Sequence, residues 1–192
     1  EGYALAWGVG SGALLKELVD QSSLRVMVIE ADAQKAGRFR RELQSQGVAG
    51  DRLSVIVADP REVNLPPYFA SLIVAESMPT FDNSQRASFL AKSFECLRPF
   101  GGIACLAMSA AEQEVCEDLV EERKLAGAEV DSEGQWLLIS REGPLPDSAN
   151  WTHEHADAAN TRVSQDKRVK APLGLLWFGG STNDGILPRH GH

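Results

Sequence analysis

Five short apolar runs alternate with amphipathic stretches, and this alternation limits the fold of the chain more than any other feature. The runs cover residues 2–7, 25–29, 53–58, 70–75 and 103–108. Apolar residues at helical spacing occupy residues 13–19, 33–46, 84–97 and 110–125. Two more short strands are expected within 128–140, joined at 132–134. The alternation predicts an α/β fold with a doubly wound sheet, mostly parallel, that ends in a C-terminal antiparallel hairpin.

This pattern stops after Glu142, where the composition also changes. Residues 143–150 consist mainly of Gly, Pro, Asp and Ser, which is typical of a linker. Residues 1–142 contain 14 Lys and Arg against 22 Asp and Glu, so they carry the whole formal charge of −8, whereas 143–192 contain five of each. We therefore predict a sheet domain in 1–142, a linker in 143–150, and an incomplete, irregular or β segment in 151–192.

Charge, hydropathy and cysteine content exclude several classes of protein. An acidic chain is a poor match for generic binding to a nucleic-acid backbone. There is no apolar run of about 18 residues, so no membrane-spanning helix is predicted. The three cysteines, Cys96, Cys105 and Cys116, are too few for a disulfide framework, and we expect reduced, mostly buried thiols.

Three alternating glycines, Gly8, Gly10 and Gly12, lie between the first predicted strand and the first predicted helix. A glycine-rich turn at this place exposes backbone N–H groups at a helix N-terminus, and a ligand can approach closely because there is no Cβ. The segment reads as GxGxG, or as GxGxxA if Ala13 takes the third small position. A tight turn that binds nothing is the alternative.

Acidic residues follow the next predicted strands. Glu30 comes 22 residues after Gly8, where a carboxylate accepts hydrogen bonds from ribose hydroxyls. Asp59 is placed to meet the exocyclic amine of a base or to cap a turn, and Glu76 follows the fourth apolar run. Glu30 could also be a solvated strand-end residue, Asp59 a plain turn residue and Glu76 a structural residue. Because the carboxyl ends of parallel strands lie at one edge of the sheet, the glycine turn, Glu30 and Asp59 together favour a ligand site there.

Residues 3–142 resemble the class I S-adenosylmethionine-dependent methyltransferases, which have a Rossmann-like sheet. The similar segments are YALAWGVGSGALLKELV, VMVIEAD, RLSVIVADP, ASLIVAES and FLAKSFECLRPFGGIACLA. The last contains an element like L-x-P-G-G, which nicotinamide-binding domains do not usually carry. The resemblance implies a seven-stranded sheet whose last strand is antiparallel, and S-adenosylmethionine as the cofactor. It assigns the cofactor to Gly8, Gly10, Gly12, Glu30, Ala31, Asp59, Pro60 and Glu76.

Two departures from the family leave alternatives open. The family usually has an acidic residue two positions before the first loop glycine, where this chain has Ala6 followed by Trp7. The sequence also starts at the first strand, without the helices that cover the cofactor, so we expect either that a longer protein supplies them or that the site is open. The alternatives are an NAD(P)-dependent oxidoreductase and a non-catalytic scaffold. Glu76 is a candidate base or substrate-amine acceptor, and the acceptor substrate is not identified.

The tail resembles the opening of a quinoprotein-type β-propeller with PQQ repeats. The similar parts are Trp151–His153, 160–164 and 173–177. Since one blade needs four strands, the resemblance implies that PQQ would bind only in the remainder of a larger, multidomain protein. Two histidine pairs, His153 with His155 and His190 with His192, have no Cys or carboxylate cluster to complete a metal site, so no metal is predicted. The cofactor and thiols favour the cytoplasm, and a quinoprotein would favour an extracytoplasmic location.

Overall fold

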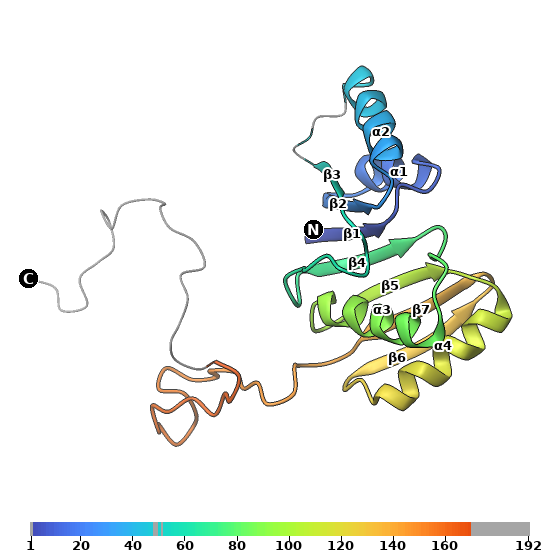
Figure 1. Ribbon diagram of the computed structural model, residues 1–192. Coiled ribbons are helices and arrows are strands. Elements are labelled where there is room, and N and C mark those ends of the chain that lie inside the picture. The colour runs from blue at the N-terminus through green and yellow to red at the C-terminus, as the bar shows by residue number, and fades with distance from the viewer. Residues whose placement is uncertain (1, 48–49, 51, 170–192) are drawn as a thin grey trace, which may run out of the picture. The chain divides into compact units, whose positions relative to one another are not determined.

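The computed structural model describes residues 2–47, 50 and 52–169, and the contacts divide the chain into two units, Glu1–Pro146 and Asp147–His192. The strands of the first unit are β1 (Gly2–Trp7), β2 (Leu24–Glu30), β3 (Leu53–Val57), β4 (Ala70–Ala75), β5 (Gly102–Ala107), β6 (Ala128–Glu133) and β7 (Trp136–Arg141). Its helices are α1 (Ala13–Gln21), α2 (Ala33–Ser45), α3 (Asn83–Cys96) and α4 (Ala110–Arg123). Figure 1 shows how they are arranged.

The seven strands form one sheet in the order β3-β2-β1-β4-β5-β7-β6. The first five strands are parallel, and β7 runs antiparallel to both of its neighbours, β5 and β6. This arrangement confirms the predicted α/β fold, with a mostly parallel sheet and an antiparallel end. The hairpin turn comes slightly later than the sequence predicts, because β6 continues through Glu133 and the chain turns at Gly134, which has φ of +61°.

Apolar side chains cover the two faces of the sheet and form two buried clusters. On one face, α1 and α2 contribute Leu15, Ala36 and Phe39 to a cluster with the central strands. On the other, α3 and α4 contribute residues such as Phe94 and Cys116. Strands covered on both faces explain the near-continuous apolar runs in the sequence.

Capping side chains determine where the helices begin. Asp32 accepts hydrogen bonds from the backbone N–H groups of Gln34 and Lys35, at 2.7 and 3.1 Å, and so starts α2 directly after β2. A capping box of Asp82 with Gln85 starts α3. The Asp32 cap keeps the connection after β2 short and holds the end of β2 close to α2, whereas the chain between β4 and α3 is longer, from Glu76 to Asp82.

The cysteines are free thiols, as the sequence predicts. Cys96 and Cys116 are buried and Cys105 is half-buried. Burial raises the pKa of Cys96 and of Cys116 to about 11, and it also raises the pKa of Cys105. These thiols therefore stay protonated at neutral pH and act as small apolar core residues.

The second unit is irregular over its described part, residues 147–169. Within this part, His153 and Ala156 form an isolated antiparallel β-bridge. The apolar run 173–178 and the pair His190 and His192 lie outside the described residues, so the propeller resemblance stays a prediction. No helix within the described ranges has the length and hydropathy needed to cross a membrane.

Candidate functional site

The turn between β1 and α1 is held by bonds to the ends of β2 and β4. The Gly8 N–H donates to the Ile29 carbonyl at 2.8 Å, and the Val9 N–H donates to Glu30 Oε2 at 3.0 Å. Gly10 has φ of +59°, and a Cβ there would lie 1.6 Å from Glu76 Oε2. Position 10 therefore requires glycine both for its left-handed backbone and for the approach of Glu76.

Glu30 is the last residue of β2, and its side chain turns back toward the glycine turn. The carboxylate is buried, and its second oxygen accepts a hydrogen bond from the Asp32 N–H at 3.0 Å. Lys35 places its Nζ 3.5 Å from Glu30 Oε2. Two backbone donors and one cation therefore fix the carboxylate in one position at the carboxyl end of the sheet.

Asp59 follows β3 and is paired with a residue two positions later. Arg61 donates from Nε to both carboxylate oxygens, at 2.9 and 3.0 Å, and from its backbone N–H at 2.8 Å. The hydrogen bonds from the Arg61 side chain and backbone lower the pKa of Asp59 to about 2. The side chain of Asp59 is thus an anion at neutral pH, and Arg61 occupies both of its oxygens.

Glu76 directly follows β4 and accepts hydrogen bonds from one residue of the glycine turn. The Ser11 N–H donates to Oε2 at 2.8 Å, and the Ser11 hydroxyl donates to Oε1 at 3.1 Å. Since α1 begins at Ala13, the bond to the Ser11 N–H places the Glu76 carboxylate beside the turn that leads into that helix. Negative charge is stabilised there by the helix dipole.

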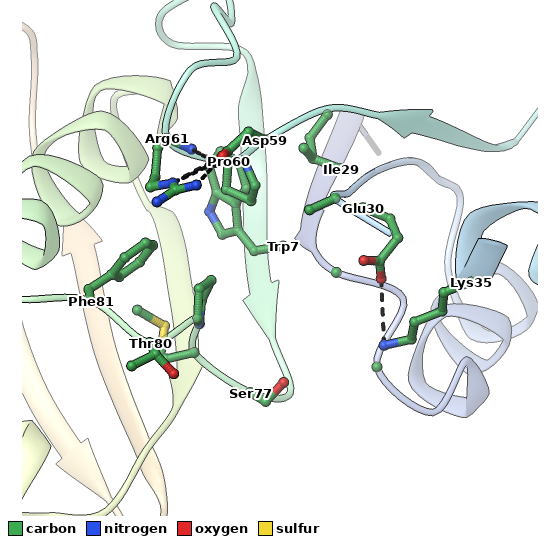
Figure 2. A pocket seen from close by; sticks show the side chains of 15 residues that line it. Trp7, Ile29, Glu30, Lys35, Asp59, Pro60, Arg61, Ser77, Thr80 and Phe81 are labelled. Carbon is green, nitrogen blue, oxygen red and sulfur yellow. Dashed lines mark hydrogen bonds and ion pairs between the residues drawn. The ribbon is translucent and has the colours of Figure 1, made fainter. Parts of the chain in front are cut away.

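These strand ends enclose a cavity of about 370 Å³ (Figure 2). We call the side formed by Gly8, Gly10, Glu30 and Lys35 the glycine wall, and the side formed by residues 78–81 the apolar wall. The volume is within the range of small-molecule sites, roughly 300–1,000 Å³. The cavity lining is Trp7, Gly8, Gly10, Ile29, Glu30, Ala31, Lys35, Asp59, Pro60, Arg61, Ser77, Met78, Pro79, Thr80 and Phe81.

Six of the eight cofactor residues predicted from sequence line this cavity. They are Gly8, Gly10, Glu30, Ala31, Asp59 and Pro60. Gly12 does not line it and instead adjoins the ring of Phe39, to which a Cβ would come within 2.7 Å. Glu76 does not line it either, but its chain neighbour Ser77 and its contact Gly10 both do.

Several cavity residues were not predicted from sequence. Trp7 is buried, donates from Nε1 to Ser93 Oγ at 3.1 Å, and lies 5.0 Å from the Phe89 ring by centroids. It thereby joins the end of β1 to α3. Lys35 and Arg61 each lie close in sequence to a predicted carboxylate, which was a usable signal. The apolar wall carries no motif, and only the fold places it opposite the glycines.

The described residues contain no group of three or more His, Cys, Asp or Glu side chains that could hold a metal ion. The carboxylates of the site are held by cations and N–H groups instead. Glu30 contacts Lys35 and Asp59 contacts Arg61. Such carboxylates suit hydroxyl, amine or cationic groups of an organic ligand.

Comparison with known proteins places this arrangement among methyltransferases. The sequence model of the family described as "Methyltransferase domain" matches residues 4–101. A protein named "Probable ribosomal RNA small subunit methyltransferase A", from Haloarcula marismortui, is 37% identical over 70 residues. That match covers 36% of this chain and spans about a quarter, 24%, of the relative's length.

Solved structures share the fold at low sequence identity. A candidate S-adenosylmethionine-dependent methyltransferase from Methanococcus maripaludis has a TM-score of 0.64 at 16% identity, over 76% of this chain and 80% of the other. The glycopeptide N-methyltransferase MtfA, solved in complex with S-adenosylmethionine, has a TM-score of 0.55 at 19% identity, over 75% of this chain and 88% of the other.

Proposed function

This chain belongs to the methyltransferase domain family, whose sequence model matches residues 4–101, and from that membership we propose that it binds S-adenosylmethionine and transfers its methyl group to an acceptor. The observation that carries the proposal is the cavity, because it brings Gly8, Gly10, Glu30 and Asp59 around one space of about 370 Å³. These residues come from the carboxyl ends of three parallel strands, β1, β2 and β3.

The polar groups of the cavity suit the adenosine part of this cofactor. We assign the ribose hydroxyls to Glu30, whose carboxylate is fixed by the N–H groups of Val9 and Asp32. We assign the exocyclic amine of adenine to Asp59, which is ionised at neutral pH. Ala31 and Pro60 add small apolar surfaces beside these carboxylates, where a base could lie. The amino-acid end then extends toward Gly10.

S-adenosylmethionine supplies a methyl group made electrophilic by a cationic sulfur. The protein's contribution is mainly alignment and the exclusion of water, because an acceptor atom must approach that carbon opposite the sulfur. Carboxylates at the strand ends stabilise the bound cation, and the apolar wall limits access of water. A side chain that abstracts a proton is not required when the acceptor can lose its proton to solvent.

We place the acceptor on the side of the apolar wall, since Phe81 lies across the cavity from Glu30 and Lys35 (Figure 2) and its neighbours Met78 and Pro79 also line the cavity. By their names, the relatives described above act on different acceptors, ribosomal RNA and a glycopeptide. The chemical class of the acceptor therefore varies among proteins of this fold, and the proposal extends only to the methyl donor.

Thermal unfolding with added ligand tests the proposal. At about 100 times its Kd, S-adenosylhomocysteine should stabilise the chain by about 2.7 kcal/mol, which raises Tm by several degrees. NAD should produce no shift. Stabilisation by NAD and not by S-adenosylhomocysteine would instead support a nicotinamide-dependent oxidoreductase. Binding of neither ligand at millimolar concentration, by calorimetry, would support a non-catalytic scaffold.

A further inference from the structure

The carboxylates at the strand ends differ in their partners. Glu30 has a cation within 3.5 Å, Lys35 Nζ, and Asp59 has the guanidinium of Arg61. Within the described part of the chain, Glu76 accepts hydrogen bonds only from Ser11 and forms no ion pair with a Lys, Arg or His. Among the described residues, Glu76 is therefore the strand-end carboxylate beside the cavity whose charge is not matched by a Lys, Arg or His side chain.

The position of Glu76 follows from the register of β1 and β4. Ala6 pairs with Val74, and both side chains belong to the same buried cluster on the α1 and α2 face. Since side chains alternate along a strand, the residue two positions after Val74 projects to the same face, one step nearer the carboxyl end. That residue is Glu76. Glu76 thus follows the strand next to the one that carries Ala6, on the same face of the sheet and two residues beyond the pairing partner of Ala6.

Position 6 itself supplies no polar group, because Ala6 is only 1% exposed and carries a methyl group. Glu76, by contrast, reaches across the turn to Ser11 and lies against Gly10, which lines the cavity. Ser77, the next residue along the chain, lines the cavity at the end away from Asp59 (Figure 2). A cationic ligand group that reached this end would meet a carboxylate already held in place by Ser11.

We propose that Glu76 binds the α-ammonium group of the amino-acid end of S-adenosylmethionine, in place of an acidic side chain at position 6. This inference rests on the proposed function. The Ser11 N–H and hydroxyl hold the carboxylate, and Gly10 makes room for it. Glu76 is a cofactor-binding residue in this assignment and not a base acting on the acceptor.

The test compares two ligands in calorimetric titrations of the full 192-residue chain. S-adenosylhomocysteine has the ammonium group, whereas 5′-methylthioadenosine has the same adenosine part and lacks the amino-acid end. Glu76→Gln keeps an oxygen that can accept from the Ser11 N–H, so the turn keeps its main tether. We expect its Kd for S-adenosylhomocysteine to rise about 10-fold or more, while the Kd for 5′-methylthioadenosine changes less than about 2-fold.

Glu62→Gln is the matched control, because it removes one exposed carboxylate that does not line the cavity. It should leave both affinities unchanged. If Glu76→Gln changes neither affinity, or weakens both ligands equally, the inference is wrong, and the second result would make Glu76 a support for the turn. If the unaltered chain binds neither ligand, the proposed function itself fails, which separates the two failures.

Discussion

The two walls of the cavity are held by different forces. In the glycine wall and the turn that carries it, the N–H groups of Gly8, Val9 and Ser11 all donate to residues at the ends of β2 and β4, at 2.8–3.0 Å. No hydrogen bond among the described residues involves residues 78–81. The apolar wall is instead held by packing, for example of the Phe81 ring on the Phe89 ring, whose centroids lie 5.1 Å apart.

This difference separates what each wall can specify. A wall fixed by charged and backbone hydrogen bonds recognises one ligand with a constant arrangement of polar groups, because each bond has a required direction. A wall fixed by side-chain packing tolerates exchange of one apolar residue for another. We therefore expect the glycine wall to determine the affinity for the cofactor and the apolar wall to determine which acceptor fits.

Gly10→Ala should have the largest effect on cofactor binding. The new Cβ atom would lie only 1.6 Å from the present position of Glu76 Oε2. The carboxylate must therefore move away and lose its hydrogen bonds from Ser11. We expect the Kd for S-adenosylhomocysteine to rise about 100-fold, the upper range for losing a hydrogen bond to a charged group. Isothermal titration calorimetry would measure it.

Gly134→Ala is the matched control for this variant. Gly134 has φ of +61°, almost the same as Gly10, but nothing lies within 4 Å of its added Cβ. Both variants should lose about 1–2 kcal/mol of stability from the left-handed backbone, and only Gly10→Ala should lose ligand affinity. Equal affinity losses would show that strain, and not Glu76, explains the effect.

Glu30→Gln should have the next largest effect, since it weakens the second tether of the glycine wall. The carboxylate oxygens accept separately from Val9 and Asp32, and the amide can accept only through its one oxygen. We expect about a 10- to 30-fold loss of affinity for 5′-methylthioadenosine, from the weaker bond to ribose. Glu42→Gln, which removes an exposed carboxylate paired with Lys16, should leave that affinity unchanged.

The order of strands and helices could be predicted from sequence because each element carries its own signal. The five apolar runs all became parallel strands within one or two residues of their predicted bounds. Asp32 and Asp82 cap the helices that follow β2 and β4. The strand-end carboxylates were also predictable, since a doubly wound sheet brings the ends of its parallel strands together.

The partners of these carboxylates were not predictable to the same extent. The contact of Glu76 with Ser11 joins residues 65 positions apart, and its existence depends on the register of β1 against β4. The apolar wall has no sequence motif, because packing of Phe81 on Phe89 requires only apolar residues of suitable size. Sequence therefore indicated which charges lie at the site, and the fold determined which of them are already matched.

Arg61→Gln sharpens the comparison at Asp59, which lies between the walls. Arg61 holds the pKa of Asp59 at about 2, below its ordinary 3.8, so the pair favours the folded state above pH 3.8 and this contribution is lost as pH falls toward 2. In the variant, the pKa of Asp59 should rise toward 3.8, as carboxyl ¹³C NMR would show. An adenine amine would then no longer compete with Arg61, and affinity for 5′-methylthioadenosine should increase by no more than about 5-fold, because exposed ion pairs are weak.

Met78→Ala should have the smallest effect on cofactor affinity and is the most direct test of the apolar wall. Met78 lines the cavity and packs, half-buried, against the cluster that contains Phe81. Its loss removes apolar surface but no hydrogen bond or charge. We expect the chain to lose about 1–2 kcal/mol of stability, below the range for a fully buried methionine, while the Kd for S-adenosylhomocysteine changes less than about 2-fold. If this variant weakened S-adenosylhomocysteine as much as Glu30→Gln weakens 5′-methylthioadenosine, the walls would not be separate in function. The apolar wall would then contact the cofactor, and the acceptor would have to bind elsewhere.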